Sequence, residues 1–206
     1  MIAFPTTGLY AVTPESLSGD KLVERVAGAL TGGARVIQYR DKSSDSAQRR
    51  RDAERLLELC KRHRAPLVIN DDVALAREIG ADGVHVGKDD AAIDVARHEL
   101  GNDAIIGVSC YNQARLALDA QAAGASYIAF GSFFPSLTKP GAVRATIELV
   151  AEARASINVP IVGIGGITAE NAPALLAAGV DSLAVVNAVF GHDTEKGAAA
   201  FAALFD

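Results

Sequence analysis

Residues 66–87, with the sequence PLVINDDVALAREIGADGVHVG, show the alternation that decides the fold of this chain. Two short apolar runs, residues 66–70 and 82–87, flank a longer segment of helical period. Strands that are buried on both faces read as continuous apolar runs, and a helical crossover implies that the two strands it joins are parallel. The stretch therefore predicts a strand–helix–strand unit.

The same alternation continues along the whole chain. Short apolar, β-branched runs occur eight times, at residues 8–13, 34–39, 66–70, 82–87, 104–109, 126–131, 160–165 and 182–190. Eight strand–helix units in one chain is the count of the TIM barrel. A doubly wound open sheet is the alternative, but no GxGxxG motif follows the first run. With no linker or low-complexity segment, we predict an α/β fold that consists of one TIM (β/α)8 barrel domain over residues 1–206.

The segments between the runs carry helical patterns and capping residues. In the segment 49–62, the apolar positions follow the spacing of one helix face, and they are Ala53, Leu56, Leu57 and Cys60. Asn112 is a candidate N-cap for a helix that stops at Gly124, and Thr168 for one that stops at Gly179. These patterns support helical crossovers between the strands.

Composition excludes several classes of protein. Half of the 206 residues are hydrophobic, and the net charge of −5 argues against nucleic acid as a bulk electrostatic partner. The N-terminus lacks a signal peptide pattern, and no apolar run approaches the length of a membrane span. The two cysteines, Cys60 and Cys110, form no CxxC pair or disulfide framework. We expect a cytoplasmic globular protein that acts on small molecules without a membrane partner, and a homo-oligomer is left open.

Polar residues gather where the predicted strands end. In TIM barrels the active site is built from the carboxyl ends of the strands and the loops that follow them. The polar residues at these places are Gln38, Arg40, Lys42, Asn70, Asp71, Asp72, Lys88, Asp89, Asp90, Ser109, Ser136, Thr138 and Lys139. Any one of them alone is more often a solvated loop residue, but their occurrence together at one rim predicts an active site.

These side chains suit anionic ligands. Arg and Lys pair with phosphate oxygens, and two carboxylates from neighbouring strands suit Mg²⁺ together with substrate phosphates. Gly165 and Gly166 have no side chains, so their amides can approach a phosphate closely. We therefore expect two phosphate sites, one cationic and metal-assisted, and one built from backbone amides after the last two strands.

The histidines and cysteines are not expected to supply a nucleophile or a base. His85 lies within a predicted strand, where a packed, hydrogen-bonded histidine is the favoured interpretation. The sequence shows no evident Ser/His/Asp or Cys/His arrangement. Cys110 directly follows Ser109, but we expect it to be a buried structural thiol.

Seven motifs, in their order and spacing, resemble the thiamine phosphate synthase family. They are GLYAVT (8–13), QYRDK (38–42), NDDVALA (70–76), DGVHVGKDD (82–90), GVSC (107–110), GSFFPSLTK (131–139) and PIVGIGGI (160–167), and the resemblance covers essentially the whole chain. The resemblance implies a TIM-barrel transferase that uses Mg²⁺. Its reaction would join 4-amino-2-methyl-5-hydroxymethylpyrimidine diphosphate to 4-methyl-5-(2-phosphoethyl)thiazole, or its carboxylated form, giving thiamine phosphate and pyrophosphate.

By the same resemblance, the polar residues divide between two substrates and a metal. The pyrimidine diphosphate would be held by Gln38, Arg40, Lys42, Asn70, Ser109 and Lys139. Of these, the catalytic residues would be Arg40, Lys42, Ser109 and Lys139. Mg²⁺ would be bound by Asp71 and Asp90. The thiazole phosphate would be held by Ser136, Thr138, Gly166, Val186 and Asn187.

The resemblance also implies the course of the reaction. Pyrophosphate leaves first, giving a pyrimidine carbocation that the thiazole nitrogen attacks. The protein then has to supply charge stabilisation and orientation rather than a strong base. Because such a cation must be kept from water, we expect residues 133–143 to form a lid that closes when both phosphates are bound.

The chain departs from the usual family pattern at Lys88, Tyr111, Ser132, Ser136 and Asn187. Two other functions are therefore weighed against the synthase. Thiazole tautomerases share the barrel but are expected to use a histidine where this chain has Tyr111, and the intact QYRDK motif with Asp71 and Asp90 favours the synthase. A barrel that binds a phosphorylated thiazole or thiamine without catalysis is the second alternative.

Overall fold

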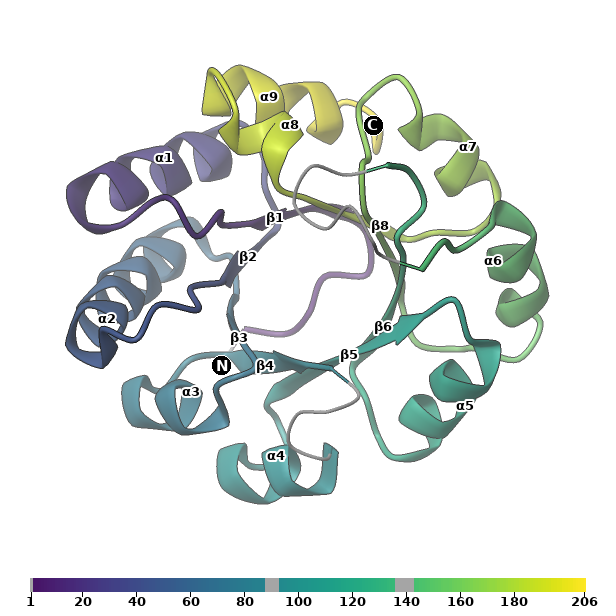
Figure 1. Ribbon diagram of the computed structural model, residues 1–206, viewed down its shortest axis with the longest axis horizontal. Coiled ribbons are helices and arrows are strands. Elements are labelled where there is room, and N and C mark those ends of the chain that lie inside the picture. The colour runs from purple at the N-terminus through teal and green to yellow at the C-terminus, as the bar shows by residue number, and fades with distance from the viewer. Residues whose placement is uncertain (1, 88–92, 136–142) are drawn as a thin grey trace.

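A closed eight-stranded barrel forms the centre of the computed structural model, which describes residues 2–87, 93–135 and 143–206 (Figure 1). All strands are parallel and pair in chain order, and β8 closes the barrel against β1. The strands are β1 (Gly8–Val12), β2 (Val36–Tyr39), β3 (Leu67–Asn70), β4 (Gly83–Val86), β5 (Ile105–Tyr111), β6 (Tyr127–Phe130), β7 (Ile161–Ile164) and β8 (Ser182–Val185). The TIM-barrel fold predicted from the sequence is confirmed.

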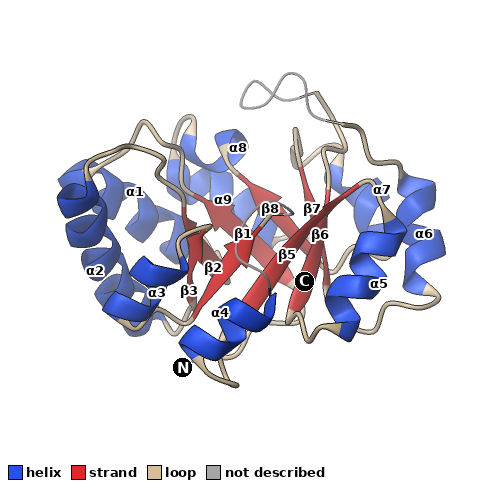
Figure 2. Cartoon of the chain, turned by 60° about the horizontal axis from the view of Figure 1, so that its bottom comes forward, coloured by secondary structure: helices blue, strands red, loops and turns tan. Residues whose placement is uncertain are grey.

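Helices cover the outside of the barrel (Figures 1 and 2). They are α1 (Gly19–Thr31), α2 (Ser46–His63), α3 (Val73–Ile79), α4 (Ile93–Leu100), α5 (Ala114–Ala122), α6 (Ile147–Arg154), α7 (Ala172–Ala177), α8 (Asn187–Phe190) and α9 (Thr194–Ala202). Within the described ranges, none of them combines the length and the apolar character that a membrane crossing requires.

The predicted strand over residues 182–190 is too long. The backbone leaves the extended conformation at Val186, and residues 187–190 form the short helix α8 instead. The amide of Phe190 donates to the carbonyl of Val186 at 2.9 Å, which closes the helical turn. An apolar run alone does not distinguish a buried strand from a buried helix, so the sequence pattern missed this change.

The two predicted N-caps are each displaced from the observed ones. Gln113 rather than Asn112 occupies the N-cap of α5, and its side chain makes no capping hydrogen bond. Asn171 rather than Thr168 occupies the N-cap of α7. Thr168 still supports this turn, because its Oγ1 accepts from the Asn171 amide at 3.4 Å while Asn171 Oδ1 accepts from the Thr168 amide at 2.9 Å.

The strands separate two apolar cores. Successive side chains of a strand point to opposite faces, so each strand contributes to the barrel interior and to the layer between strands and helices. The outer core receives the predicted face of α2, which consists of Ala53, Leu56, Leu57 and Cys60. The inner core consists of Tyr10, Val12, Val36, Val68, Ile105, Tyr127, Ala129, Val162 and Ala184.

The segment before β1 closes one end of the barrel. It runs across the centre of the barrel in Figure 1, and in Figure 2 the N-terminus lies at the end where the strands begin. The amide of Ile2 donates to Asp82 Oδ1 at 2.7 Å, and Phe4 packs against the inner core. The opposite end, where the strands finish, is the one that carries the polar loops.

Candidate active site

A cavity of about 910 Å³ opens at the carboxyl ends of the barrel strands. We call it the central cavity. Of the predicted site residues, it is lined by Gln38, Arg40, Asn70, Ser109, Gly166, Val186 and Asn187. Its floor is formed by inner-core side chains such as Tyr10 and Tyr127, and its volume is in the range of cavities that hold small ligands.

A second cavity, of about 440 Å³, adjoins the first at Asn70, which lines both. We call it the rim cavity. It is lined by Asp41, Lys42, Arg49, Asn70, Asp71, Asp72 and Val73. The three alternating residues of the QYRDK motif are therefore divided, because Gln38 and Arg40 face the central cavity whereas Lys42 lies at the rim cavity.

Several predicted residues lie outside the part of the chain that the structure describes. The predicted site residues in this group are Asp90, Ser136, Thr138 and Lys139. Lys88, Asp89 and residues 136–142 of the expected lid also belong to it. The functions assigned to them stay predictions from the sequence.

Thr13, directly after β1, fixes the backbone at the end of β2. Its Oγ1 accepts from the Arg40 amide at 2.9 Å, and its own amide donates to the Gln38 carbonyl at 2.9 Å. The Arg40 side chain is 18% exposed, and its Nη1 lies 2.7 Å from Glu15 Oε1. The guanidinium is therefore held at the mouth of the central cavity by a carboxylate that is itself half-exposed.

Lys42 and Asp71 form an ion pair at the rim cavity. Lys42 Nζ lies 3.0 Å from Asp71 Oδ2, and Asn70 Nδ2 donates to the same oxygen at 2.6 Å. Asp71 has a left-handed backbone, with φ of +63°, and its amide donates to the His85 carbonyl at 2.8 Å. Non-glycine residues in this conformation are uncommon and gather at functional sites.

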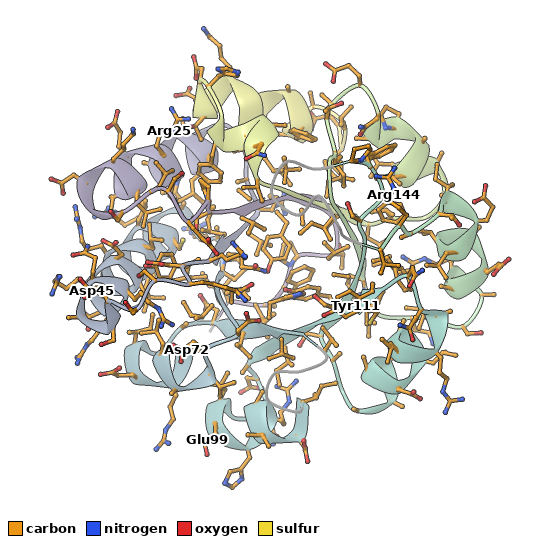
Figure 3. The ribbon with its side chains drawn as sticks, in the orientation of Figure 1. Arg25, Asp45, Asp72, Glu99, Tyr111 and Arg144 are labelled. Carbon is orange, nitrogen blue, oxygen red and sulfur yellow. The ribbon has the colours of Figure 1, made fainter. Side chains whose placement is uncertain are left out.

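Asp72, the next residue, lies beside α3 (Figure 3), and it serves the fold instead. Its Oδ1 accepts from the Leu75 amide at 2.9 Å and so caps α3. Its other oxygen forms an ion pair with Arg49 of α2, which ties α2 to the beginning of α3. The two adjacent carboxylates thus have different roles, since Asp72 joins two helices whereas Asp71 pairs with Lys42 at the rim cavity.

Among the described residues of the rim cavity, Asp71 is the one that the sequence predicts as a ligand of Mg²⁺. Residues 2–87, 93–135 and 143–206 contain no group of three or more His, Cys, Asp or Glu side chains that could hold a metal ion. Mg²⁺ usually takes only one or two carboxylates together with water and substrate phosphates. Asp71, with 28% of its side chain exposed, offers the oxygen ligand that such a site needs.

A chain of hydrogen bonds lies on the floor of the central cavity. Gln38 Nε2 donates to the Tyr10 hydroxyl at 2.8 Å, and the hydroxyls of Tyr10 and Tyr127 are 2.7 Å apart. The Tyr127 hydroxyl lies 2.8 Å from Nδ1 of His85, and Nε2 of His85 lies 2.9 Å from Ser109 Oγ. The sequence-based interpretation of His85 as a packed, hydrogen-bonded histidine is confirmed.

Sequence reasoning missed Tyr10 and Tyr127. It considered only strand ends, whereas these residues lie within β1 and β6 and reach the site from below. The sequence signal that could have found them is the alternation of side chains along a strand, which places Tyr10 on the same face as Val12. In a closed barrel the same alternation directs both tyrosines inward. Burial raises the pKa of each of these two tyrosines well above its usual value, so both hydroxyls stay protonated at neutral pH.

The two glycines after β7 let a neighbouring loop approach. A side chain at Gly165 would lie 2.1 Å from Ser132 Oγ, and one at Gly166 would lie 2.3 Å from the Pro135 carbonyl oxygen. Both also have positive φ, of +103° and +64°. Packing of the loop after β6 is thus a reason for these glycines beyond the expected approach of a phosphate.

The closed barrel, with two cavities at the carboxyl ends of its strands that carry cationic, carboxylate and amide side chains, has the architecture of a TIM-barrel enzyme that acts on small molecules. A family model described as thiamine monophosphate synthase matches residues 9–189 of the chain. The chain belongs to this family.

Curated relatives and solved structures agree with the assignment. The thiamine-phosphate synthase of Methylococcus capsulatus is 49% identical over 205 residues, which cover 99% of this chain and 92% of the relative. That of Thiobacillus denitrificans is 51% identical over 206 residues, covering 100% of this chain and 97% of the relative. A solved thiamine phosphate pyrophosphorylase from Pyrococcus furiosus has a TM-score of 0.87 and 34% identity, covering 97% of this chain and 95% of its own.

Proposed function

We propose that this protein is a thiamine-phosphate synthase. It would join 4-amino-2-methyl-5-hydroxymethylpyrimidine diphosphate to 4-methyl-5-(2-phosphoethyl)thiazole and release pyrophosphate. The observation that carries the proposal is the central cavity, where the residues expected to hold the diphosphate and those expected to hold the thiazole phosphate line one space. The identity of about half the residues with two thiamine-phosphate synthases over nearly their whole length supports it.

The diphosphate side of the cavity is built from Gln38, Arg40, Asn70 and Ser109. Arg40 would bind phosphate oxygens with its planar guanidinium, which is already directed to the cavity mouth. Negative charge on the leaving pyrophosphate grows as its bond to carbon breaks. A cation that is oriented before this step stabilises the transition state more than the ground state, and so lowers the barrier.

The thiazole side is built from Gly166, Val186 and Asn187. Val186 packs against the inner core and offers an apolar surface for the thiazole ring. Asn187, at the first position of α8, is exposed and places an amide where the family usually has a serine. Holding both reactants in one cavity converts a bimolecular step into an effectively unimolecular one.

Mg²⁺ bound in the rim cavity would neutralise charge on the diphosphate and favour the departure of pyrophosphate. We assign Asp71 as a ligand, together with Asp90 from the sequence. Lys42 is paired with a carboxylate oxygen of Asp71, so the lysine and a cation held by Asp71 would compete for that carboxylate. A lysine released from Asp71 can bind a phosphate oxygen instead, since 55% of its side chain is exposed.

The proposed reaction needs no strong base, and the cavity is consistent with this. Two of the described histidines line the cavity. His192 is exposed, whereas His85 lies on the floor with its two ring nitrogens within hydrogen-bond distance of Tyr127 and Ser109. The chain would therefore act through charge stabilisation at the leaving group and through orientation of the thiazole nitrogen, as expected for a reaction in which pyrophosphate leaves first.

Turnover tests the proposal. The purified protein is incubated with both substrates and Mg²⁺, and thiamine phosphate and pyrophosphate are quantified, with reactions that lack either substrate as controls. We expect equal amounts of the two products. A protein that binds the thiazole phosphate but forms no thiamine phosphate would instead be a non-catalytic binding barrel, and isomerisation of the thiazole alone would indicate a tautomerase.

A further inference from the structure

The hydrogen-bond chain on the cavity floor connects five strands of the barrel. It runs from Gln38 on β2 through Tyr10 on β1, Tyr127 on β6 and His85 on β4 to Ser109 on β5. Gln38 is 5% exposed, Tyr10 1%, Tyr127 0% and His85 9%, so the chain is largely shielded from solvent. In such surroundings hydrogen bonds are strong and each one fixes the direction of the next.

The direction of the chain follows from counting its hydrogens. In the orientation that its side-chain amide adopts here, Gln38 places Nε2, which only donates, against the Tyr10 hydroxyl, so the Tyr10 oxygen accepts from it. The Tyr10 hydroxyl then donates to the Tyr127 oxygen, and the Tyr127 hydroxyl donates to Nδ1 of His85. Nδ1 of a neutral imidazole that accepts leaves the hydrogen on Nε2, which donates to Ser109 Oγ.

The opposite direction does not place every hydrogen. If Ser109 donated to His85, the Tyr127 hydroxyl would have to donate to Tyr10. The Tyr10 oxygen would then accept from both Tyr127 and Gln38, and its own hydrogen would have no acceptor within the chain. Because an unpaired buried hydroxyl is unfavourable, the direction from Gln38 to Ser109 is preferred.

Packing holds the central ring of the chain in place. Tyr127 is stacked on Phe4 at 4.2 Å between ring centroids and on His85 at 5.6 Å. Gly107 leaves room for the Tyr127 ring, since a Cβ there would lie 2.0 Å from Tyr127 Cζ. The N-terminal segment thus supports the cavity floor through Phe4, at the end of the barrel opposite the cavity mouth.

We propose that Tyr10, Tyr127 and His85 are positioning residues that turn the hydroxyl hydrogen of Ser109 toward the central cavity. Nε2–H of His85 occupies the Ser109 oxygen as an acceptor, and the Ser109 hydrogen is then donated to the ligand. A donor is what an anionic phosphate oxygen requires, whereas a serine that donated to His85 would face the ligand with lone pairs. The nature of the ligand, a diphosphate, rests on the proposed function, but the direction of the chain does not.

Nitrogen-15 NMR of histidine-labelled protein tests the direction without any substrate. The protein contains four histidines, and the signals of His85 are assigned by their loss in H85Q. From the hydrogen-bond geometry we expect a hydrogen on Nε2 of His85 and none on Nδ1. In Y127F this preference should weaken, because Nδ1 loses its donor. A wild-type His85 with its hydrogen on Nδ1, or with hydrogens on both nitrogens, would overturn the proposal.

Steady-state kinetics test the consequence for the site. Y127F removes one hydroxyl and keeps the ring that packs on Phe4. We expect kcat/KM for the pyrimidine diphosphate to fall about five- to tenfold, as for one lost hydrogen bond, with the KM for the thiazole phosphate unchanged. Equal kcat/KM values for Y127F and the wild type would contradict the proposal.

Y39F is the matched control. It also removes the hydroxyl of a buried tyrosine. This hydroxyl donates to Asp41 at 3.2 Å and does not belong to the hydrogen-bond chain on the cavity floor. The His85 signals should stay as in the wild type, and kcat/KM should change less than about twofold. A wild type that forms no thiamine phosphate would refute the proposed function, whereas the NMR result would still decide the direction of the chain. If Y127F does not fold, the wild-type spectrum alone decides it.

Discussion

Replacement of Arg40 by alanine tests the assignment of the diphosphate to the central cavity. Arg40 has a backbone fixed by Thr13 and a side chain held at the cavity mouth by Glu15. Alanine keeps the backbone contact with Thr13 and removes the side chain beyond Cβ, the guanidinium included. We therefore expect R40A to fold normally and to lose the electrostatic stabilisation of the leaving pyrophosphate.

The expected magnitude follows from the place of the side chain. A donor or cation aimed at developing charge in a partly buried site contributes about 2–4 kcal/mol, which corresponds to about a 30- to 1,000-fold loss of kcat/KM. The Arg40 side chain is 18% exposed, so solvent screens its charge little, and we expect a loss in the upper half of this range. The loss should concern the pyrimidine diphosphate and leave the KM for the thiazole phosphate nearly unchanged.

A substitution of Glu15, the ion-pair partner of Arg40, tests the same assignment. Its carboxylate is 46% exposed, and an ion pair of this kind contributes about 0.2–1 kcal/mol, which the diphosphate must displace. E15Q should therefore lower the KM for the pyrimidine diphosphate by up to about fivefold. In the R40A background the same substitution should give little gain, because Glu15 then has no guanidinium to hold.

Initial rates with each substrate varied in turn measure these effects, and thermal unfolding checks that the variants fold. R35A is the matched control, since Arg35 precedes the same strand at the opposite end of the barrel and is exposed. An R40A protein whose only defect is a higher KM for the thiazole phosphate would refute the reasoning, because the two sides of the cavity would then be reversed.

Further predictions concern the metal, the thiols and the loop after β7. D71N should lower turnover strongly at saturating Mg²⁺ while the fold is retained, and activity that persists in EDTA would contradict the assignment. Burial raises the pKa of Cys60 and of Cys110 to about 12, so a thiol reagent at pH 8 should label them only after denaturation, and rapid labelling of the native protein would disprove this. Because both thiols keep their protons longer in the folded than in the unfolded state, the free energy of unfolding, measured with denaturant, should fall as the pH rises from about 9 toward 12. G166A should lose about 1–3 kcal/mol of stability in denaturant titrations, since its Cβ would meet the Pro135 carbonyl oxygen at 2.3 Å and its φ is +64°, and a fully stable G166A would contradict this.

The fold was predictable because its signal is local. Each strand is a short apolar run, and each helix has a face such as that of Ala53, Leu56, Leu57 and Cys60. The count of the runs then leads to the barrel, since parallel strands joined by helices close at eight. The end of β8 was not predictable in this way, because the apolar run continues unbroken into α8.

Most described candidate site residues were predictable for a related reason. Arg40 directly follows β2, Asn70 ends β3 and Ser109 lies two residues before the end of β5, and a parallel barrel brings all such ends to one rim. The separation of Lys42 from Gln38 and Arg40 was not predictable. It depends on the end of β2 at Tyr39 and on the ion pair with Asp71, which comes from the next strand.

The sequence by itself determined the alternation of strands and helices, the rim at which the polar residues gather and the family to which their motifs are similar. Only the tertiary structure decided which partners those residues have. The hydroxyls of Tyr10 and Tyr127 meet although they are 117 positions apart, and Arg40 pairs with Glu15 of a different loop. Local patterns report on neighbours within a few residues, whereas contacts across the barrel interior exist only after closure has brought strands distant in sequence within hydrogen-bond distance.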